Sequence, residues 1–391
     1  MKYNFDEVIS RLDTKTVKYD LREMLFQNSE VIPMWVADMD FRVPKEVEES
    51  LQQRVAHPIY GYTIQKETHF FKSAASWLKK RFDWTVSEKD MIFSPGVVPA
   101  LAMAVQAFTE KGDKVAFFSP VYPPFYHVVE EQGREVFDIP MEIKNNRFEL
   151  NYALLGEKLS SGVKLLLLSH PHNPGGRVWR KEELQRILEL CQKHNVVIIS
   201  DEIHADLVWW GEKHIPLASI TESAKDLVIT CLAPSKTFNL AGLACSYLVI
   251  ENPKLREQYL SIAKPMHLNF GSTFATEALV AAYEHGEEWL SQLHEYVEQN
   301  INFFTGYLSQ NIPQIKAMKP DATYLVWLDC RELGMEQREL VKFFTQKAGL
   351  GLNSGTDFGK EGSGFMRINL ACPKSVVEKA LAQLDEAVKS L

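Results

Sequence analysis

Three polar residues of different types follow apolar runs of the sequence and could do chemistry together. They are Asn173, Asp201 and Lys236. A lysine amine forms a Schiff base with an aldehyde, a carboxylate stabilises a nearby cation, and a side-chain amide donates hydrogen bonds. Taken singly, each residue also has a structural explanation as a turn residue, a cap or a solvated charge. Their occurrence in order after successive apolar runs favours a common site.

The elements that must position these residues are strands of a mostly parallel sheet. Short apolar runs at 164–169, 196–200 and 226–230 alternate with segments of helical spacing such as 181–194. This alternation is typical of βαβ units. Ligands of open parallel sheets bind outside the carboxyl ends of the strands, where the three residues fall. The sequence therefore predicts an α/β fold in which helices flank a mostly parallel sheet.

A fourth candidate element lies upstream, in the turn 94–100 with the sequence SPGVVPA. Helical spacing follows this turn, and Pro99 suits a first helical turn because its missing N–H costs nothing there. The free N–H groups of Gly96, Val97 and Val98 can therefore point at an anion. The chain contains no GxGxxG and no P-loop motif, so neither nucleotide motif competes for this role.

Together these groups match the needs of pyridoxal 5′-phosphate. Its aldehyde requires an amine, which Lys236 supplies, and its ring nitrogen requires a carboxylate, which Asp201 supplies. Asn173 offers a donor for the ring hydroxyl, the turn at 96–98 an anion site for the phosphate, and Tyr122 an aromatic face. A packing role in its proline-rich turn is the alternative for Tyr122. We therefore expect pyridoxal 5′-phosphate as the cofactor.

The length of 391 residues leaves room for more than one domain. From about residue 287 the pattern changes to a long helix followed by a strand at 324–328. We expect a large cofactor-binding domain over 45–286 and a small α/β domain over 287–391. The N-terminal arm, 1–44, is expected to form part of the small domain.

Composition excludes several other classes of protein. Hydrophobic content of 46% and charged content of 24% are typical of a folded chain. The 43 basic and 51 acidic residues give a net charge of −8, so we expect no nucleic-acid partner. No apolar run approaches the roughly 18 residues of a membrane span. The N-terminus lacks the apolar stretch of a secretory signal, so we expect a cytoplasmic protein.

A metal centre is not expected either. The five cysteines contain no CxxC pair, which argues against a zinc ribbon and a disulfide framework. Asp201, Glu202 and His204 are ligand types at close spacing, but on a strand-to-loop segment they would point in different directions. The chain also has no GxSxG motif, so a serine hydrolase has little support.

The sequence resembles the fold-type I pyridoxal-phosphate enzymes of the class I/II aminotransferase group. The match runs nearly end to end, with SPGVVPAL, VYPPF, HPHNPGGR, SDEIHADL, APSKTFNLAGL and MRINLACP in the family's order. The strings PMWVADMDF, YGYT and APSKTFNLAG are similar to the MalY/PatB branch of carbon–sulfur β-lyases. The resemblance implies α,β-elimination of L-cystathionine and related L-cysteine S-conjugates. The expected products are a thiol such as homocysteine, pyruvate and ammonia.

The resemblance also implies roles for individual residues. Lys236 is implied as the Schiff-base lysine and general base, Asp201 as the partner of the ring nitrogen, and Asn173 as the donor to the ring hydroxyl. Tyr122 matches the aromatic residue that stacks on the ring. Arg367 matches the clamp of the substrate α-carboxylate, for which the planar guanidinium fork is suited.

Further positions are implied around these five. Val97, Val98 and Ser235 are expected to bind the cofactor phosphate, together with Tyr62 of the neighbouring subunit. A homodimer with shared active sites follows from that last contact. Trp35 and Asn173 are expected to bind substrate beside Arg367.

One departure from the wider family bears on the activity. Many aminotransferases place an arginine eight residues after the Schiff-base lysine, and this chain has Ala244 there. The departure is compatible with the lyase branch and weakens a plain aminotransferase assignment. An aminotransferase remains the nearer alternative, because it shares every cofactor contact. A non-catalytic regulatory protein that binds the cofactor is the more distant alternative.

Overall fold

Two sheets of different size organise the chain in the computed structural model, which describes residues 2–268 and 270–391. The larger sheet has seven strands, and all neighbours pair in parallel except β10, which is antiparallel to β2 and β9. In spatial order the strands are β2 (Met91–Ser94), β10 (Ser246–Val249), β9 (Val228–Leu232), β8 (Val197–Asp201), β7 (Val163–Ser169), β3 (Lys114–Ser119) and β4 (Glu135–Pro140). The predicted mostly parallel sheet is confirmed.

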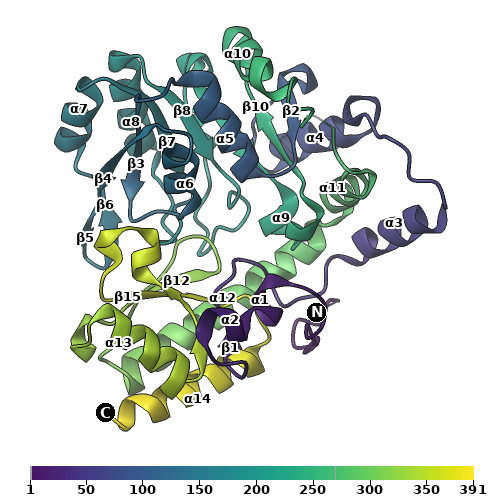
Figure 1. Ribbon diagram of the computed structural model, residues 1–391. Helices are drawn as coiled ribbons and strands as arrows, with labels where there is room; N and C mark the ends of the chain where they lie inside the picture. The colour runs from purple at the N-terminus through teal and green to yellow at the C-terminus, as the bar shows by residue number, and fades with distance from the viewer. Residues whose placement is uncertain (1, 269) are drawn as a thin grey trace.

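Helices cover both faces of this sheet (Figure 1). Alternate residues of a strand point to opposite faces, so Leu165 and Leu167 of β7 join one apolar cluster while Leu166 and Leu168 join the other. Burial on both faces explains the unbroken apolar runs of these strands. One face packs against α5 (Val97–Phe108), α6 (Pro124–Glu130) and α10 (Pro253–Ala263), and the other against α4 (Phe70–Phe82), α7 (Tyr152–Ser160), α8 (Lys181–His194) and α11 (Thr273–His285).

The C-terminal part of the chain forms a second, antiparallel sheet. Its strands in spatial order are β11 (Lys316–Met318), β12 (Leu325–Asp329), β15 (Phe365–Asn369) and β14 (Asn353–Ser354). The long helix α12 (Glu287–Asn311) contacts both β11 and α14 (Lys374–Lys389), and α13 (Gln337–Lys342) lies in the same part of the molecule (Figure 1). The change of pattern near residue 287 thus coincides with the start of α12.

The N-terminal arm lies against this C-terminal part (Figure 1). It contains two short helices, α1 (Val17–Asp20) and α2 (Arg22–Phe26). Its strand β1 (Ile32–Pro33) pairs in parallel with β13 (Leu350–Gly351). Backbone hydrogen bonds therefore join the N-terminal arm to the C-terminal part of the chain.

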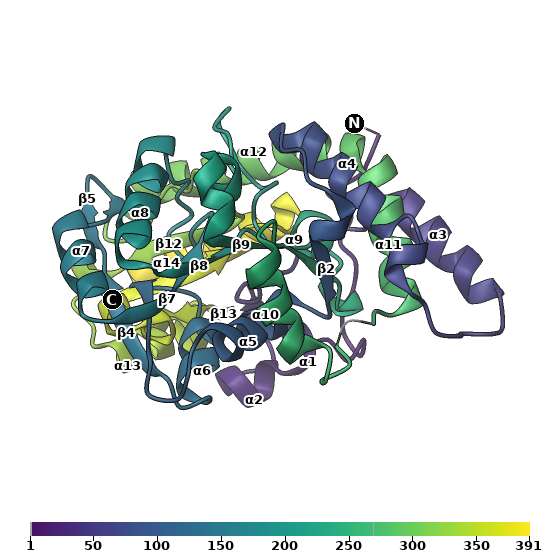
Figure 2. The ribbon, with the colours of Figure 1, turned by 90° about the horizontal axis from the view of Figure 1, so that it is seen from above.

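The remaining elements lie at the periphery. Helix α3 (Lys45–Ala56) packs against α11, and the chain that follows it, 57–69, projects from one side of the molecule (Figure 2). The strands β5 (Glu142–Lys144) and β6 (Arg147–Glu149) form a separate hairpin. Within the described residues, no helix combines the length and the apolar character that crossing a membrane requires.

Two substitutions in β7 test whether the central sheet is buried on both faces. Leu166→Ala should lower the free energy of unfolding by about 2–5 kcal/mol, because Leu166 is fully buried and its loss leaves a cavity. Lys164→Ala, at an exposed position of the same strand, should change it by less than about 0.5 kcal/mol. Urea unfolding followed by tryptophan fluorescence measures both changes, and similar losses in the two variants would contradict the burial pattern.

Candidate active site

Three of the sequence-predicted residues meet at one edge of the larger sheet. Asn173 follows β7, Asp201 ends β8, and Lys236 lies in the short helix α9 (Pro234–Thr237) directly after β9. The three strands are parallel neighbours, so their carboxyl ends share that edge. The order of apolar runs and polar loops therefore brings the amide, the carboxylate and the amine together.

The surroundings of Lys236 favour the uncharged form of its amine. Its Nζ donates a hydrogen bond of 2.6 Å to the carbonyl oxygen of Ala37. Desolvation by burial lowers the pKa of Lys236 to about 8, and the positive charge of Arg367 acts in the same direction. The carboxylates of Asp38 and Asp201 oppose this shift. The uncharged amine that a nucleophile or a general base requires is therefore far more populated near neutral pH than in an exposed lysine.

Asp201 is a carboxyl group with little water around it. Burial raises its pKa to about 7, while the N–H of Ile203, 3.2 Å from Oδ1, and the charge of Lys236 act in the opposite direction. A buried carboxylate that lacks a full set of partners is stabilised by a cation placed beside it. The site thus favours a positively charged group next to Asp201.

Arg367 reaches this edge from the smaller sheet. It lies on β15, yet one Nη donates to Oδ1 of Asn173 at 2.9 Å, and the other donates to the carbonyl oxygen of Trp35 at 2.8 Å and to Oδ1 of Asn353 at 2.6 Å. The ring of Phe358 lies 4.7 Å from the guanidinium carbon. Asn173 and Arg367 therefore connect the two sheets at the site.

One N–H group of the Arg367 guanidinium has no hydrogen-bond acceptor among the described residues. This group is Nε, which is buried. Burial lowers the pKa of Arg367 to about 10, partly offset by Tyr122, Tyr324 and Asp357. An unsatisfied cationic donor in a desolvated place is suited to a carboxylate.

Tyr122 lies between the charged groups of the site. Its N–H donates to the carbonyl oxygen of Asn173 at 3.1 Å. Burial raises the pKa of the phenol, Asp201 acts in the same direction, and Arg367 opposes the shift. The charges of both Asp201 and Arg367 therefore act on the phenol of Tyr122.

The predicted anion site begins α5, next to the same edge. Strand β2 ends at Ser94 and α5 starts at Val97, and α5 packs against β8 and β9. The N–H groups of Val97 and Val98 belong to the first turn, which has no intrahelical acceptors. Gly96 precedes them with φ of +154°, and a Cβ there would lie only 3.3 Å from Cδ of Pro99. The hydroxyl of Ser235 makes no hydrogen bond to any described residue.

Two predicted residues are placed differently from the others. Tyr62 lies in the projecting segment 57–69 and is fully exposed, without any hydrogen bond to the described residues. Trp35 contacts the site through its backbone, because its carbonyl oxygen accepts from Arg367. Its indole Nε1 donates instead to the carbonyl oxygen of Lys18 at 3.3 Å.

The site also contains two residues that the sequence analysis did not assign to it. Tyr324 is fully buried, and its hydroxyl donates to the carbonyl oxygen of Ala37 at 2.9 Å. His204 is buried with its ring 6.3 Å from that of Tyr324, and burial with the charges of Lys236 and Arg367 lowers its pKa. Its position three residues after Asp201 was an available signal for His204. No local pattern marks Tyr324.

Glu202 belongs to a different cluster from its neighbour Asp201. Its carboxylate accepts hydrogen bonds from Ser200, the N–H of Leu217 and Nε2 of His214, the last at 2.7 Å. With His170 and His214 it forms a buried group whose possible metal-ligand atoms lie within 4.8 Å of one another. Within this group, Nε2 of His214 and Oε2 of Glu202 are already joined by the hydrogen bond. His204, which the sequence grouped with Glu202, is not a member.

The chain was compared with families of known proteins and with curated relatives. Residues 29–384 match the family model described as aminotransferase class I and II. Cystathionine beta-lyase PatB of Bacillus subtilis is 42% identical over 386 residues, which cover 98% of this chain and 100% of the relative. Protein MalY of Escherichia coli is 31% identical over 391 residues, with 100% of each chain covered.

Solved structures give the same result for the fold. Cystalysin from Treponema denticola, which contains a pyridoxal 5′-phosphate cofactor, superimposes with a TM-score of 0.95 at 35% identity and 100% coverage of both chains. The PLP-bound C-S lyase from Staphylococcus hominis gives 0.92 at 33% identity, with 98% of each chain covered. The chain therefore belongs to the aminotransferase class I and II family.

Proposed function

We propose that this protein is a pyridoxal-phosphate-dependent carbon–sulfur β-lyase that cleaves L-cystathionine and related L-cysteine S-conjugates by α,β-elimination. The observation that carries the proposal is the meeting of Lys236, Asp201, Asn173 and Arg367 at one desolvated edge of the sheet. The relatives named cystathionine beta-lyase and C-S lyase support the choice of reaction.

The residues present fit the cofactor. Asp201 is a desolvated acid suited to a ring nitrogen that carries a proton, and Lys236 is a partly uncharged amine suited to a Schiff base with the aldehyde. Asn173 would hold the ring hydroxyl and Tyr122 would lie on the ring face. When bound, pyridoxal 5′-phosphate withdraws electrons from the substrate Cα and so makes its proton acidic.

The phosphate would rest on backbone and hydroxyl donors. We assign this role to the N–H groups of Val97 and Val98, the hydroxyl of Ser235, and Tyr62 of the partner subunit. A helix N-terminus favours a negative group through its free N–H groups and its dipole. This arrangement replaces the arginine that many family members have at the position of Ala244.

The substrate would be held by its carboxylate. Arg367 supplies the fork of donors, including the unpartnered Nε, and Asn173 and the backbone of Trp35 fix the guanidinium in place. The uncharged amine of Lys236 then removes the Cα proton. The thiolate leaves from Cβ, and the remaining three-carbon fragment is released and hydrolyses to pyruvate and ammonia.

We also propose the division of the chain into a large domain over 45–286 and a small domain over 287–391 joined by the arm 1–44. The separate sheets and the pairing of β1 with β13 support it. The substrate site would then lie between the two domains, because Lys236 and Arg367 belong to different sheets.

The reaction is tested with L-cystathionine in the absence of any keto acid. The wild-type protein should release thiol and pyruvate in equal amounts. Lys236→Ala should lose the visible absorption band of the Schiff base and slow turnover by roughly a hundredfold to ten-thousandfold, because the general base is gone. Lys254→Ala, at an exposed position, is the control. Turnover that strictly requires a keto acid would instead identify an aminotransferase.

The charge on Asp201 should appear as a pH dependence of stability. A folded-state pKa of about 7 means that the folded chain holds this proton more tightly than the unfolded chain does. The stabilisation is therefore complete below about pH 4 and is lost as the pH rises through 7. Cofactor-free Asp201→Asn should be more stable than the wild type at pH 8 by a few kcal/mol, since one pKa unit corresponds to about 1.4 kcal/mol.

Urea unfolding at pH 8 and pH 5 measures this difference, which should shrink at the lower pH. The cofactor should reverse the order, because the ring cation stabilises the wild-type carboxylate only. Asp226→Asn, which changes an exposed residue ahead of β9, should show neither effect. A difference that is the same at both pH values would contradict the role of Asp201.

The homodimer is tested at Tyr62. Tyr62→Phe removes one hydroxyl from the phosphate site of the partner subunit and should weaken cofactor binding about tenfold, the usual effect of losing a hydrogen bond to a charged group. Tyr60→Phe is the matched control, because its hydroxyl donates within its own chain to the carbonyl oxygen of Val55 in α3. Absorption titration gives the affinity and light scattering the mass. A monomer, or equal affinities in both variants, would contradict the proposal.

A further inference from the structure

The segment 34–41 has an unusual set of hydrogen bonds. Its carbonyl oxygens accept side-chain donors that come from both parts of the molecule. The contacts are Arg367 to Trp35, Asn369 to Val36 and Asp38, Lys236 and Tyr324 to Ala37, and Asn239 to Met39 and Phe41. The carbonyl oxygens of Trp35 and Ala37, two residues apart, thus accept from the candidate carboxylate clamp and from the candidate Schiff-base lysine.

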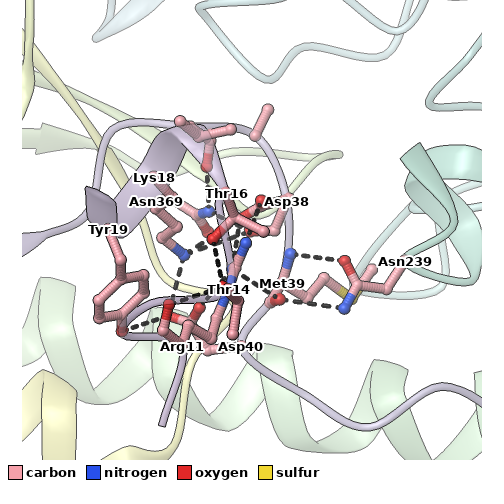
Figure 3. A network of polar contacts seen from close by, with 12 residues as sticks. Arg11, Thr14, Thr16, Lys18, Tyr19, Asp38, Met39, Asp40, Asn239 and Asn369 are labelled. Atoms are coloured by element: carbon pink, nitrogen blue, oxygen red, sulfur yellow. Dashed lines mark hydrogen bonds and ion pairs between the residues drawn. The ribbon is translucent and has the colours of Figure 1, made fainter. Parts of the chain in front are cut away.

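Asp38 and Asp40 of the same segment form ion pairs with two residues nearer the N-terminus. Arg11 contacts both carboxylates, at 2.8 Å to Asp38 and 2.7 Å to Asp40. Lys18 does the same at 3.4 Å to Asp38 and 2.9 Å to Asp40. Figure 3 shows these four residues around the segment, with Asn239 and Asn369 approaching it from other elements. We call Arg11, Lys18, Asp38 and Asp40 the ion quartet.

The ion quartet is mostly withdrawn from water. The side chain of Lys18 is 1% exposed and that of Asp40 is 7% exposed. Its two positive and two negative charges balance, and the hydroxyl of Tyr19 adds a contact of 3.4 Å to Asp40. Desolvation of such charges cancels most of their attraction, so a buried ion pair adds little to stability compared with apolar side chains of the same size. A buried ion pair can instead fix one arrangement of the groups that it joins.

The arrangement fixed here is the backbone between two candidate functional groups. Asn239 anchors the segment to the turn after α9, with its amide bonding Met39 at both N–H and carbonyl oxygen. Asn369 anchors it to β15, two residues after Arg367. The ion quartet supplies the third anchor, and it is the one that uses side chains of the segment itself.

We propose that the ion quartet is a positioning device for the active site, which sets Lys236 and Arg367 relative to each other through the backbone of residues 35–39. The inference rests on the proposed function in assigning substrate carboxylate binding to Arg367. It makes the N-terminal arm a working part of the site, although none of the four residues contacts the reacting groups. Displacements of about 1 Å in such a framework can lower rates roughly a hundredfold.

The decisive variant separates positioning from stability. In Lys18→Met combined with Asp40→Leu, apolar side chains replace one ion pair, so the free energy of unfolding should be unchanged or higher. The segment then keeps only the Arg11–Asp38 pair of its anchor, and we expect the Kd for propionate, a probe of the carboxylate clamp, to rise about tenfold. The kcat/KM for the S-conjugate should fall by at least as much. Lys18→Arg, which keeps the charge, should retain both values.

The measurements use the holoenzyme at matched cofactor absorbance, with calorimetry for propionate and urea unfolding for stability. Arg42→Gln is the control, because Arg42 adjoins the segment but forms exposed ion pairs with Glu7 and Glu48. A folded double variant with wild-type Kd and kcat/KM would overturn the positioning role, as would an equal loss in Arg42→Gln. The propionate Kd judges this role whichever reaction the enzyme catalyses, so the result is separate from the cystathionine test. If the double variant does not fold, Arg11→Gln, which breaks quartet contacts but leaves the carboxylate of Asp38 in place, is compared with Arg42→Gln by the same criteria.

Discussion

The hydrogen bond from Nζ of Lys236 to the carbonyl oxygen of Ala37 joins parts of the chain that are 199 residues apart. Around it, a lysine, an arginine and a carboxylate share a space that water scarcely enters. Burial shifts the pKa of each group in the direction that favours its uncharged form. Burying three ionisable groups costs folding free energy, which a protein without a function at this site would have no reason to spend. The two sheets, the helices on their faces and the N-terminal arm together maintain this desolvated arrangement, and an anionic substrate with a cationic ring would compensate it.

Much of this arrangement could be predicted from local patterns. The apolar run before Asn173 matches β7, because a strand buried on both faces is apolar throughout. The helix at 181–194 matches α8, because a helix buried on one side has apolar residues at helical spacing. Boundaries were less accurate. The strand expected at 226–230 is β9, at Val228–Leu232, because residues 222–226 form a single 3-10 turn that ends where the strand was expected to begin.

The contacts that complete the site had no such local pattern. Backbone carbonyl oxygens have no side-chain signature, so nothing in the sequence marked Ala37 as the acceptor for Lys236 or Tyr324 as its second donor. The cluster of Glu202 with His170 and His214 likewise forms only when separate loops meet. Trp35 meets Arg367 through its backbone carbonyl oxygen, while its indole Nε1 donates to the carbonyl oxygen of Lys18, and neither contact has a local sequence pattern. Each of these contacts joins residues that are far apart in the sequence, so no local pattern could predict it.

The parallel pairing of β1 with β13 has a consequence for the order of synthesis. The arm leaves the ribosome first, yet its partner strand is made only after some 300 further residues. The arm can therefore pair with β13 only after all strands of the larger sheet have been synthesised. Arg11, Lys18, Asp38 and Asp40 all lie within the arm, so their ion pairs do not require the later strand. Nascent chains stopped before residue 350 would possess Lys236 and Asp201 but lack the docked arm and the arginine that completes the site.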